Sequence, residues 1–181
     1  MASNQSLWPR QWLMTDERIG DRLWEAIERL PAGAGIVFRH YATPPEERAR
    51  LAQRVAEICG ARELVLAVAR DISLAERLGA ELVHKPAAPS RLPCSMPVHD
   101  AIEAEAAQIA GASLVFVAPV DPTSSHPGGQ TLGPERAAEL ARMCECPVIA
   151  LGGMDAERFA ELDAAFPGSF HGYGGIDCWL R

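Results

Sequence analysis

The stretch 147–155 (PVIALGGMD) combines residue types that can bind an anion through the main chain. Its apolar residues 148–151 predict a short strand that is buried on both faces. Gly152 and Gly153 end this strand with backbone free of side chains, and Asp155 can cap a helix that starts at the next residue. Several N–H groups and a helix dipole would then point at one spot, which suits a phosphate or a carboxylate. A tight turn without a ligand is the alternative, since such turns are common in α/β folds.

The elements that must position this stretch alternate between apolar runs and helical patterns. Apolar runs predict eight strands, at residues 11–15, 35–39, 64–69, 82–84, 92–95, 114–118, 147–151 and 170–173. Helical spacing and end signals predict helices at residues 19–30, 44–60, 71–78, 98–110, 134–143 and 155–162. No helix is expected after the fourth strand, where the sequence PAAP follows, and barely one helical turn follows the eighth.

Strands that alternate with helical crossovers predict a parallel sheet. Eight such repeats predict an α/β fold of the (β/α)₈ TIM barrel type, and an open doubly wound sheet is the alternative. The chain has 181 residues, fewer than the roughly 250 typical of this barrel, so the barrel must be compact, with reduced helices after strands four and eight. We expect residues 1–181 to form a single domain.

The place of residues 147–155 in this barrel strengthens the prediction of an anion site. The turns after strands seven and eight of such barrels frequently bind phosphate. The glycines of the first stretch form the seventh turn, and the sequence GYGG at 172–175 forms the eighth. We therefore expect a phosphate to contact the backbone amides of Gly152, Gly153, Gly174 and Gly175.

A long loop, residues 119–133, follows the sixth strand and is rich in Pro, Ser, Thr and Gly. Its segment 124–129 (SSHPGG) can serve as a mobile lid over the site, or can be an ordinary flexible loop. The candidate lid contacts with a substrate are Thr123, Ser125 and His126.

The composition limits the class of partner. A net charge of −7 argues against a general nucleic-acid binder, since binding to phosphates along a strand needs a basic face. The N-terminus lacks the pattern of a signal peptide, and no apolar run approaches the roughly 18 residues of a membrane helix. The five cysteines are scattered, and one residue separates Cys144 from Cys146, which is not the usual zinc spacing. We expect reduced thiols in a cytoplasmic protein.

Several motifs occur in an order and a spacing that are specific together, although each alone is weak. They are WLMTD at 12–16, VFR at 37–39, LGAELVH at 78–84, Ser95 with VH at 98–99, APVDPT at 118–123, and residues 147–154. On these residues the chain resembles the thiamine phosphate synthase/TenI family over nearly its full length. The resemblance implies a (β/α)₈ barrel that binds a thiazole phosphate at its C-terminal face. Synthases of the family join that molecule to a pyrimidine pyrophosphate with Mg²⁺ and release pyrophosphate, whereas TenI-type members isomerise a thiazole carboxylate phosphate without a metal.

The residues that serve the synthase reaction are largely missing from this chain. At the second strand the family usually has Gln-Leu-Arg-x-Lys, of which VFRHY at 37–41 keeps only Arg39. The Asn-Asp after the third strand, whose Asp binds Mg²⁺, is replaced by Ala69 and Arg70, and the second magnesium carboxylate falls where Pro89 stands. Mg²⁺ requires oxygen ligands, which an arginine and a proline cannot supply.

The resemblance to TenI-type members is closer. Their catalytic histidine lies in a Ser-Val-His motif after strand five, and SMPVH at 95–99 is similar, which makes His99 the candidate acid/base. A polar surface histidine is the alternative role for His99. Arg39 can bind the phosphate as its cation, or can pair with Asp71 inside the barrel. His84, at the end of an apolar strand, is expected to be a hydrogen-bonded core residue.

The function that we expect is recognition of a phosphorylated thiazole-type small molecule, with metal-independent thiazole tautomerase activity. One alternative is a Mg²⁺-dependent thiamine phosphate synthase, which would need Asp71 or Asp121 to take over the metal; the other is a catalytically degenerate relative that only binds its ligand. We expect no cofactor, no metal ligands, no nucleic-acid partner and no membrane, and leave a homodimer open. It also stays open whether Asp177, where the family commonly has serine, blocks the second half of the phosphate site.

Overall fold

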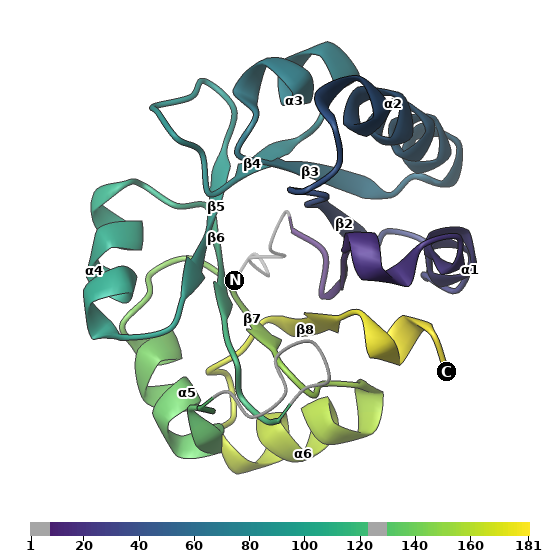
Figure 1. Ribbon diagram of the computed structural model, residues 1–181. Helices are drawn as coiled ribbons and strands as arrows, with labels where there is room; N and C mark the ends of the chain where they lie inside the picture. The colour runs from purple at the N-terminus through teal and green to yellow at the C-terminus, as the bar shows by residue number, and fades with distance from the viewer. Residues whose placement is uncertain (1–7, 123–129) are drawn as a thin grey trace, which may run out of the picture.

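In the computed structural model, which describes residues 8–122 and 130–181, eight parallel strands close into a barrel (Figure 1). Each strand pairs with the next one in the chain, and the eighth pairs with the first. The strands are β1 (Gln11–Met14), β2 (Gly35–Phe38), β3 (Val65–Ala69), β4 (Leu82–His84), β5 (Cys94–Val98), β6 (Leu114–Val117), β7 (Val148–Leu151) and β8 (Gly172–Gly175). The expected barrel is therefore confirmed, and the open doubly wound sheet is wrong.

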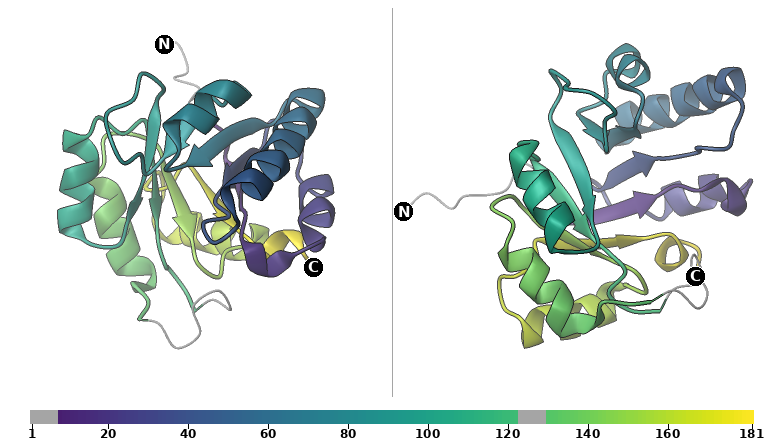
Figure 2. Two further views of the ribbon diagram at one scale, coloured as in Figure 1. Left: turned by 45° about the horizontal axis from the view of Figure 1, so that its top comes forward. Right: turned by 60° about the vertical axis from the view of Figure 1, so that its left-hand side comes forward.

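Helices surround the barrel on its outside (Figure 2). They are α1 (Arg22–Glu28), α2 (Pro45–Arg62), α3 (Ile72–Leu78), α4 (Ala101–Ile109), α5 (Gly133–Arg142) and α6 (Ala156–Ala165), with short 3₁₀ helices η1 (Glu17–Ile19) and η2 (Asp177–Trp179). As predicted for a compact barrel, the loop between β4 and β5 forms no helix, and only η2 follows β8. Asp71, Asp100 and Asp155 cap α3, α4 and α6, because each carboxylate accepts the N–H group three residues on.

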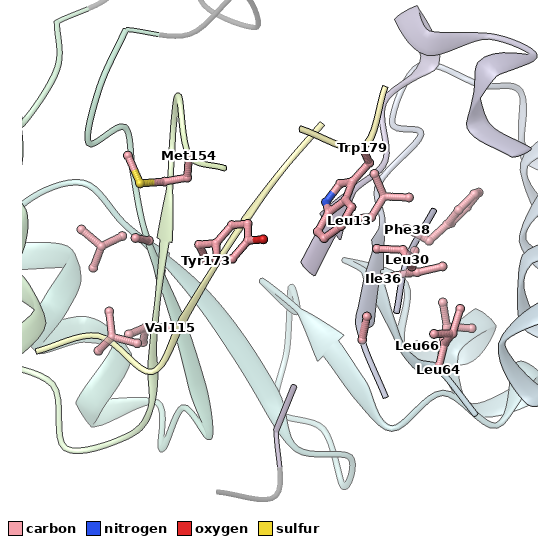
Figure 3. Packing of buried hydrophobic residues seen from close by; sticks show 14 of the residues in the cluster. Leu13, Leu30, Ile36, Phe38, Leu64, Leu66, Val115, Met154, Tyr173 and Trp179 are labelled. Atoms are coloured by element: carbon pink, nitrogen blue, oxygen red, sulfur yellow. The ribbon is translucent and has the colours of Figure 1, made fainter. Parts of the chain in front are cut away.

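Apolar side chains form two packed layers. One lies between the strands and the helices and includes Leu13, Ile36 and Phe38, which Figure 3 shows from close by. The other layer fills the barrel interior with Trp12, Met14, Val37, Ala67, Leu82, Leu114, Phe116, Ile149 and Ile176. The rings of Trp12 and Phe116 meet edge to face there, with centroids 5.5 Å apart. Because side chains fill the interior, a ligand finds room only at an end of the barrel.

Two strands begin two residues later than the sequence predicted. β5 starts at residue 94 rather than 92, so the helix expected from residue 98 begins only at residue 101. β8 occupies residues 172–175 rather than 170–173, so the sequence GYGG is a strand and not the eighth turn. Glycine is needed there, because a Cβ on Gly172 would lie 1.9 Å from the carbonyl oxygen of Arg10. The first predicted helix is also divided, with η1 and α1 separated at Gly20.

The pairing of β8 with β1 closes the ring. Arg10 Nε donates a hydrogen bond to the carbonyl of His171 at 2.9 Å, and Trp179 Nε1 donates one to the carbonyl of Trp12 at 3.0 Å. Residues more than 150 positions apart in the chain are therefore joined at this seam.

The cysteines are all free thiols, as predicted. Burial raises the pKa of Cys59 and of Cys178 to about 12 and that of Cys146 to about 11, so these thiols are protonated at neutral pH. In the part of the chain that the structure describes, no helix has the length and the apolar character to cross a membrane.

Candidate active site

A cavity of about 450 Å³ opens at the carboxyl ends of the barrel strands, the end at which barrel enzymes hold their active sites. Met14, Phe116 and Leu151 contribute apolar surface to it. Polar side chains reach it from several elements, namely Arg39, His84, His99, Gln130, Arg158, Asp177 and Arg181. Apolar walls with a few convergent polar groups suit a small ligand that carries charge.

The turn after β7 presents backbone donors to this cavity. Gly152 and Gly153 have left-handed φ angles of 93° and 67°. The N–H groups of Gly152, Gly153 and Met154 have no acceptor among the described residues, and all three residues line the cavity. A Cβ on Gly152 would lie 2.7 Å from the Cβ of Pro119, so this backbone path requires glycine. Such a turn of free amides can hold an anion.

Helix α6 follows this turn and adds to its preference for negative charge. Asp155 caps the helix by accepting the N–H of Arg158 at 3.0 Å. The Arg158 side chain returns toward the turn, with Nη1 3.2 Å from the carbonyl oxygen of Gly153 and 3.6 Å from Asp121 Oδ2. Arg181 lines the cavity as well, with Nη1 3.4 Å from Asp155. Sequence analysis missed both arginines; the place of Arg158 in the first turn of α6 was a usable signal, whereas nothing in the sequence indicated Arg181.

The eighth turn contributes less than predicted. Gly175 lines the cavity, but Gly174 lies inside β8 and does not line it. Asp177 also lines the cavity, which puts a carboxylate where a phosphate was expected. The hydrogen bond that Arg18 donates to Asp16 and, with smaller weight, the charge of Asp177 raise the pKa of Arg18, so Asp177 has a cation nearby. Any phosphate at this turn would have to accommodate that carboxylate.

Arg39 reaches the cavity from the end of β2. Its Nε donates to the carbonyl of Thr15 at 2.7 Å, and its Nη2 lies 3.4 Å from Asp16 Oδ2. The alternative pairing of Arg39 with Asp71 is wrong, because Asp71 lies 3.5 Å from Arg48 instead. Burial lowers the pKa of Arg39, and the charge of Asp16 opposes this effect. Arg39 therefore has only part of its guanidinium free for a ligand.

His99 directly follows β5 and lines the cavity while half exposed. Its Nδ1 lies 2.6 Å from Glu103 Oε2, and the same oxygen accepts the backbone N–H of His99 at 2.8 Å. Since a carboxylate only accepts, the neutral imidazole carries its proton on Nδ1 and has a lone pair on Nε2. This is the geometry of a general base oriented by a carboxylate. Glu103 was also missed, although its position four residues on, at helical spacing, was visible in the sequence.

His84 is a hydrogen-bonded core residue, as predicted, and it also forms part of the cavity wall. Its Nδ1 lies 3.1 Å from Ser95 Oγ, and its ring meets Phe116 at a centroid distance of 5.4 Å. Burial lowers the pKa of His84 to about 3, and neighbouring cations, led by Arg39, add to this effect. Ser95, which belongs to the motif that resembles the catalytic one, is fully buried and does not line the cavity.

The ends of β2, β3 and β4 are occupied by the protein's own contacts. His40, Arg70 and Lys85 follow these strands with left-handed φ angles of 36°, 66° and 48°, which are uncommon for residues other than glycine. His40 Nδ1 lies 2.9 Å from Thr15 Oγ1, and the Arg70 guanidinium lies 4.4 Å from the ring centroid of Tyr41. None of these three residues lines the cavity.

Arg48 of α2 holds these strand ends together. Its side chain is 12% exposed and donates to the carbonyls of Arg39, His40 and Ala69 at 3.3, 3.1 and 2.9 Å. Arg48 therefore satisfies backbone oxygens that follow β2 and end β3, which is a structural role.

The residues present do not fit the Mg²⁺ site that a synthase would need. Arg70 stands where the family has a magnesium aspartate. Asp71 accepts the N–H of Leu74 at 2.9 Å and faces Arg48, and Asp121 faces Arg158. Within residues 8–122 and 130–181, no three His, Cys, Asp or Glu side chains gather closely enough to hold a metal ion. The available carboxylates serve the protein's own arginines and a helix cap.

The predicted lid contacts lie outside the described residues; they are Thr123, Ser125 and His126. The described flanks of the same loop border the cavity through Pro119, Pro122 and Gln130. The lid itself stays a prediction.

Comparison with known proteins gives a consistent result. Residues 12–165 match the TMP-TENI family model, described as thiamine monophosphate synthase. The chain is 26% identical over 186 residues to "Putative thiamine-phosphate synthase 2" of Aquifex aeolicus, covering 96% of this chain and 98% of the relative. It is 31% identical over 149 residues to the thiamine biosynthesis bifunctional protein ThiM/ThiE of Symbiobacterium thermophilum, covering 75% of this chain but 31% of that protein. The thiamine phosphate pyrophosphorylase of Pyrococcus furiosus shares the fold, with a TM-score of 0.76 and 20% identity over 93% of this chain and 85% of that one.

Proposed function

The chain belongs to the thiamine monophosphate synthase family, and we propose that within it this protein binds a phosphorylated thiazole and isomerises it without a metal ion. The observation that carries the proposal is the pair of His99 and Glu103 at the cavity, with Nδ1 and Oε2 2.6 Å apart. A turn of free amides lines the same cavity. A base and an anion site at one cavity are what an isomerase of a phosphorylated substrate requires.

The isomerisation removes a proton from one carbon of the thiazole and returns a proton to another, so the composition of the molecule does not change. Nε2 of His99 accepts the first proton, because Glu103 keeps Nδ1 protonated. The imidazolium that forms is stabilised by the Glu103 carboxylate until it gives the proton back. No step needs a metal ion or a redox cofactor.

The phosphate of the substrate binds at the seventh turn. The N–H groups of Gly152, Gly153 and Met154 supply three donors, and the N-terminus of α6 supplies a favourable dipole. Arg158 adds a cation that is half exposed and thus available. Asp177 makes the eighth turn a poorer place for the phosphate, because two anions repel each other.

One observation favours the synthase alternative, namely that a relative aligned over 96% of the chain carries that activity in its name. The chain would then need Asp71 or Asp121 to hold Mg²⁺, and both carboxylates already face arginines. A relative that binds the thiazole phosphate without turnover is the third candidate. For the isomerase we expect a cytoplasmic location, where free thiols stay reduced.

The test compares His99→Ala with the wild type and with His171→Ala, a control histidine that does not line the cavity. Proton NMR follows the isomerisation of thiazole carboxylate phosphate, and calorimetry gives its Kd. We expect His99→Ala to lower kcat by on the order of 10²-fold or more while Kd changes only a few-fold. His171→Ala should retain wild-type turnover.

Three results would speak against the isomerase. Normal turnover by His99→Ala would remove the base from the proposal. Pyrophosphate release from a thiazole phosphate and a pyrimidine pyrophosphate, rising with Mg²⁺ concentration, would establish the synthase instead. Stabilisation by thiazole carboxylate phosphate in a thermal shift, without turnover by the wild type, would leave a binding protein.

A further inference from the structure

His84 has a ring nitrogen that its own protein does not use. Nδ1 lies 3.1 Å from Ser95 Oγ, whereas Nε2 has no hydrogen-bond partner among the described residues. The residue is only 4% exposed. Every fully buried side-chain nitrogen or oxygen of the described residues has a partner, so the unpartnered Nε2 is not fully buried. Nε2 must therefore reach the cavity that His84 lines. A nearly buried histidine with an unpartnered nitrogen at a cavity indicates a contact reserved for a ligand.

The hydroxyl of Ser95 decides which nitrogen of His84 carries the proton. Ser95 is fully buried, and the only described side-chain partner of its Oγ is Nδ1 of His84. The hydroxyl proton would be left without an acceptor if Nδ1 were itself protonated, which costs free energy in a buried place. Oγ–H therefore donates to Nδ1, and the neutral ring carries its proton on Nε2. Toward the cavity, His84 is a hydrogen-bond donor.

The surroundings keep this ring neutral. The apolar ring of Phe116 packs against it, and the positive charges of Arg39 after β2, Arg70 after β3 and Lys85 after β4 disfavour its protonation. Burial and these three cations together lower the pKa of His84 to about 3. The donor is therefore available over the whole physiological pH range without a net charge.

We propose that Nε2–H of His84 donates a hydrogen bond to the atom of the substrate that gains negative charge when His99 removes a proton, such as a ring nitrogen or a carboxylate oxygen. The two histidines then offer the ligand opposite hydrogen-bonding groups, an acceptor at His99 and a donor at His84. At His99 the carboxylate of Glu103 leaves a lone pair on Nε2, and at His84 the hydroxyl of Ser95 leaves a proton there. His84 keeps its proton throughout and stabilises charge, as preorganised donors do in oxyanion holes.

The inference rests on the proposed isomerase for its kinetic part, but its structural part can be measured without turnover. In the full-length protein labelled with ¹⁵N, histidine NMR should show His84 with an unprotonated Nδ1 and a protonated Nε2. These signals should not titrate between pH 8 and roughly pH 4.5, given the pKa of about 3. Saturation with thiazole carboxylate phosphate should shift the Nε2–H resonance.

Kinetics of matched variants measure the contribution to the reaction. His84→Leu removes the donor, and we expect kcat to fall by about 10²-fold while Kd rises only a few-fold. His84→Gln keeps an N–H near the same place and should recover most of that loss. Ser95→Ala removes the group that fixes the tautomer and should lower kcat by about tenfold, with the imidazole still present. Thermal unfolding of each variant identifies losses that come from misfolding.

The outcomes separate this inference from the proposed function. A protonated Nδ1, titration of His84 near pH 6.5, or an Nε2–H signal that ignores the ligand would each overturn the donor role. Wild-type kcat in a folded His84→Leu would also overturn it, while leaving the isomerase intact. If the wild type does not isomerise the ligand but Nε2–H shifts on binding, the proposed function fails and ligand recognition by His84 stands.

Discussion

The two sides of the barrel mouth are constructed in opposite ways. At the end of β7, three backbone N–H groups have no acceptor in the described part of the chain, and the backbone at Gly152 and Gly153 leaves no room for a Cβ. At the ends of β2 and β3, the carbonyls are covered by one buried arginine, Arg48, and the neighbouring side chains bond to each other. The β7 side therefore has free donors for a ligand, whereas the polar groups on the β2–β3 side are already paired within the protein.

This difference shows that charge alone does not separate a structural arginine from a candidate for ligand binding. Arg48 is 12% exposed, and its N–H groups donate to backbone carbonyls. Arg158 is 51% exposed and lies beside the turn after β7. Its Nη1 donates to the carbonyl of Gly153 and lies 3.6 Å from Asp121 Oδ2. The state of the surrounding backbone therefore separates a structural arginine from one that can hold a phosphate.

The largest effect should follow from placing a side chain on the turn after β7. Gly152→Ala adds a Cβ 2.7 Å from Pro119 at a φ of 93°, so it combines a clash with backbone strain. We expect the free energy of unfolding to fall by about 3 kcal/mol and phosphate-ligand binding to be lost, as measured by urea denaturation and calorimetry.

Gly33→Ala is the matched control for this change. Gly33 has a φ of 73° but nothing within 4 Å of the added Cβ, so only conformational strain applies and we expect a loss of about 1 kcal/mol. Equal losses in the two variants would show that the close approach of Pro119 to the turn is unimportant.

A second pair of substitutions tests the two sides directly. Arg48→Met should lower the free energy of unfolding by about 2 kcal/mol, because it leaves buried carbonyls without donors, while ligand Kd stays near the wild-type value. Arg158→Met should do the reverse, with about a tenfold rise in the Kd for thiazole carboxylate phosphate and little change in stability. Denaturation measures the stability of both variants, and calorimetry measures their Kd. If both variants lose the same property, the two sides of the mouth do not differ as described.

The smallest effect concerns Asp16, which contacts Arg39 at the β2–β3 side of the barrel mouth. The hydrogen bond from Arg18 lowers the pKa of Asp16 to about 2, below the ordinary value of 3.8 for this side chain. A lowered carboxylate pKa stabilises the fold above roughly pH 4, and this contribution disappears as the pH falls toward 2. After allowance for solvent screening, Asp16→Asn should cost about 1 kcal/mol at pH 7 and almost nothing at pH 2. An equal cost at both pH values in denaturation experiments would contradict this origin.

Most of the fold could be predicted from local patterns. The strands predicted at 82–84, 35–39 and 114–118 match β4, β2 and β6 to within one residue, because buried parallel strands need continuous apolar residues. The predicted bounds of β5 and β8 were displaced, because Pro97 in β5 and the three glycines of β8 are uncommon in strands. Gly172 and Gly174 are required by the close approach of the Arg10 and Trp12 backbone, which lies more than 150 residues away in the sequence.

The candidate site was only half visible in the sequence. The glycines of the seventh turn and His99 could be found, since a strand followed by two glycines and a helix start is a local pattern. The proposed donor role of His84 could not be found, because it depends on contacts with Ser95 and Phe116 from two other strands. The contact of Arg181 with Asp155 likewise depends on how the chain returns after β8.

The seam between β1 and β8 also affects how the protein is made. β1 is synthesised before the other strands, yet one of its two neighbours is β8, so the ring stays open until β8 has left the ribosome. Until then the nascent chain has an unpaired strand edge that a neighbouring chain can join. A chain truncated before Gly172 would keep both β1 and β7 unpaired on one side, and we expect it to aggregate when expressed.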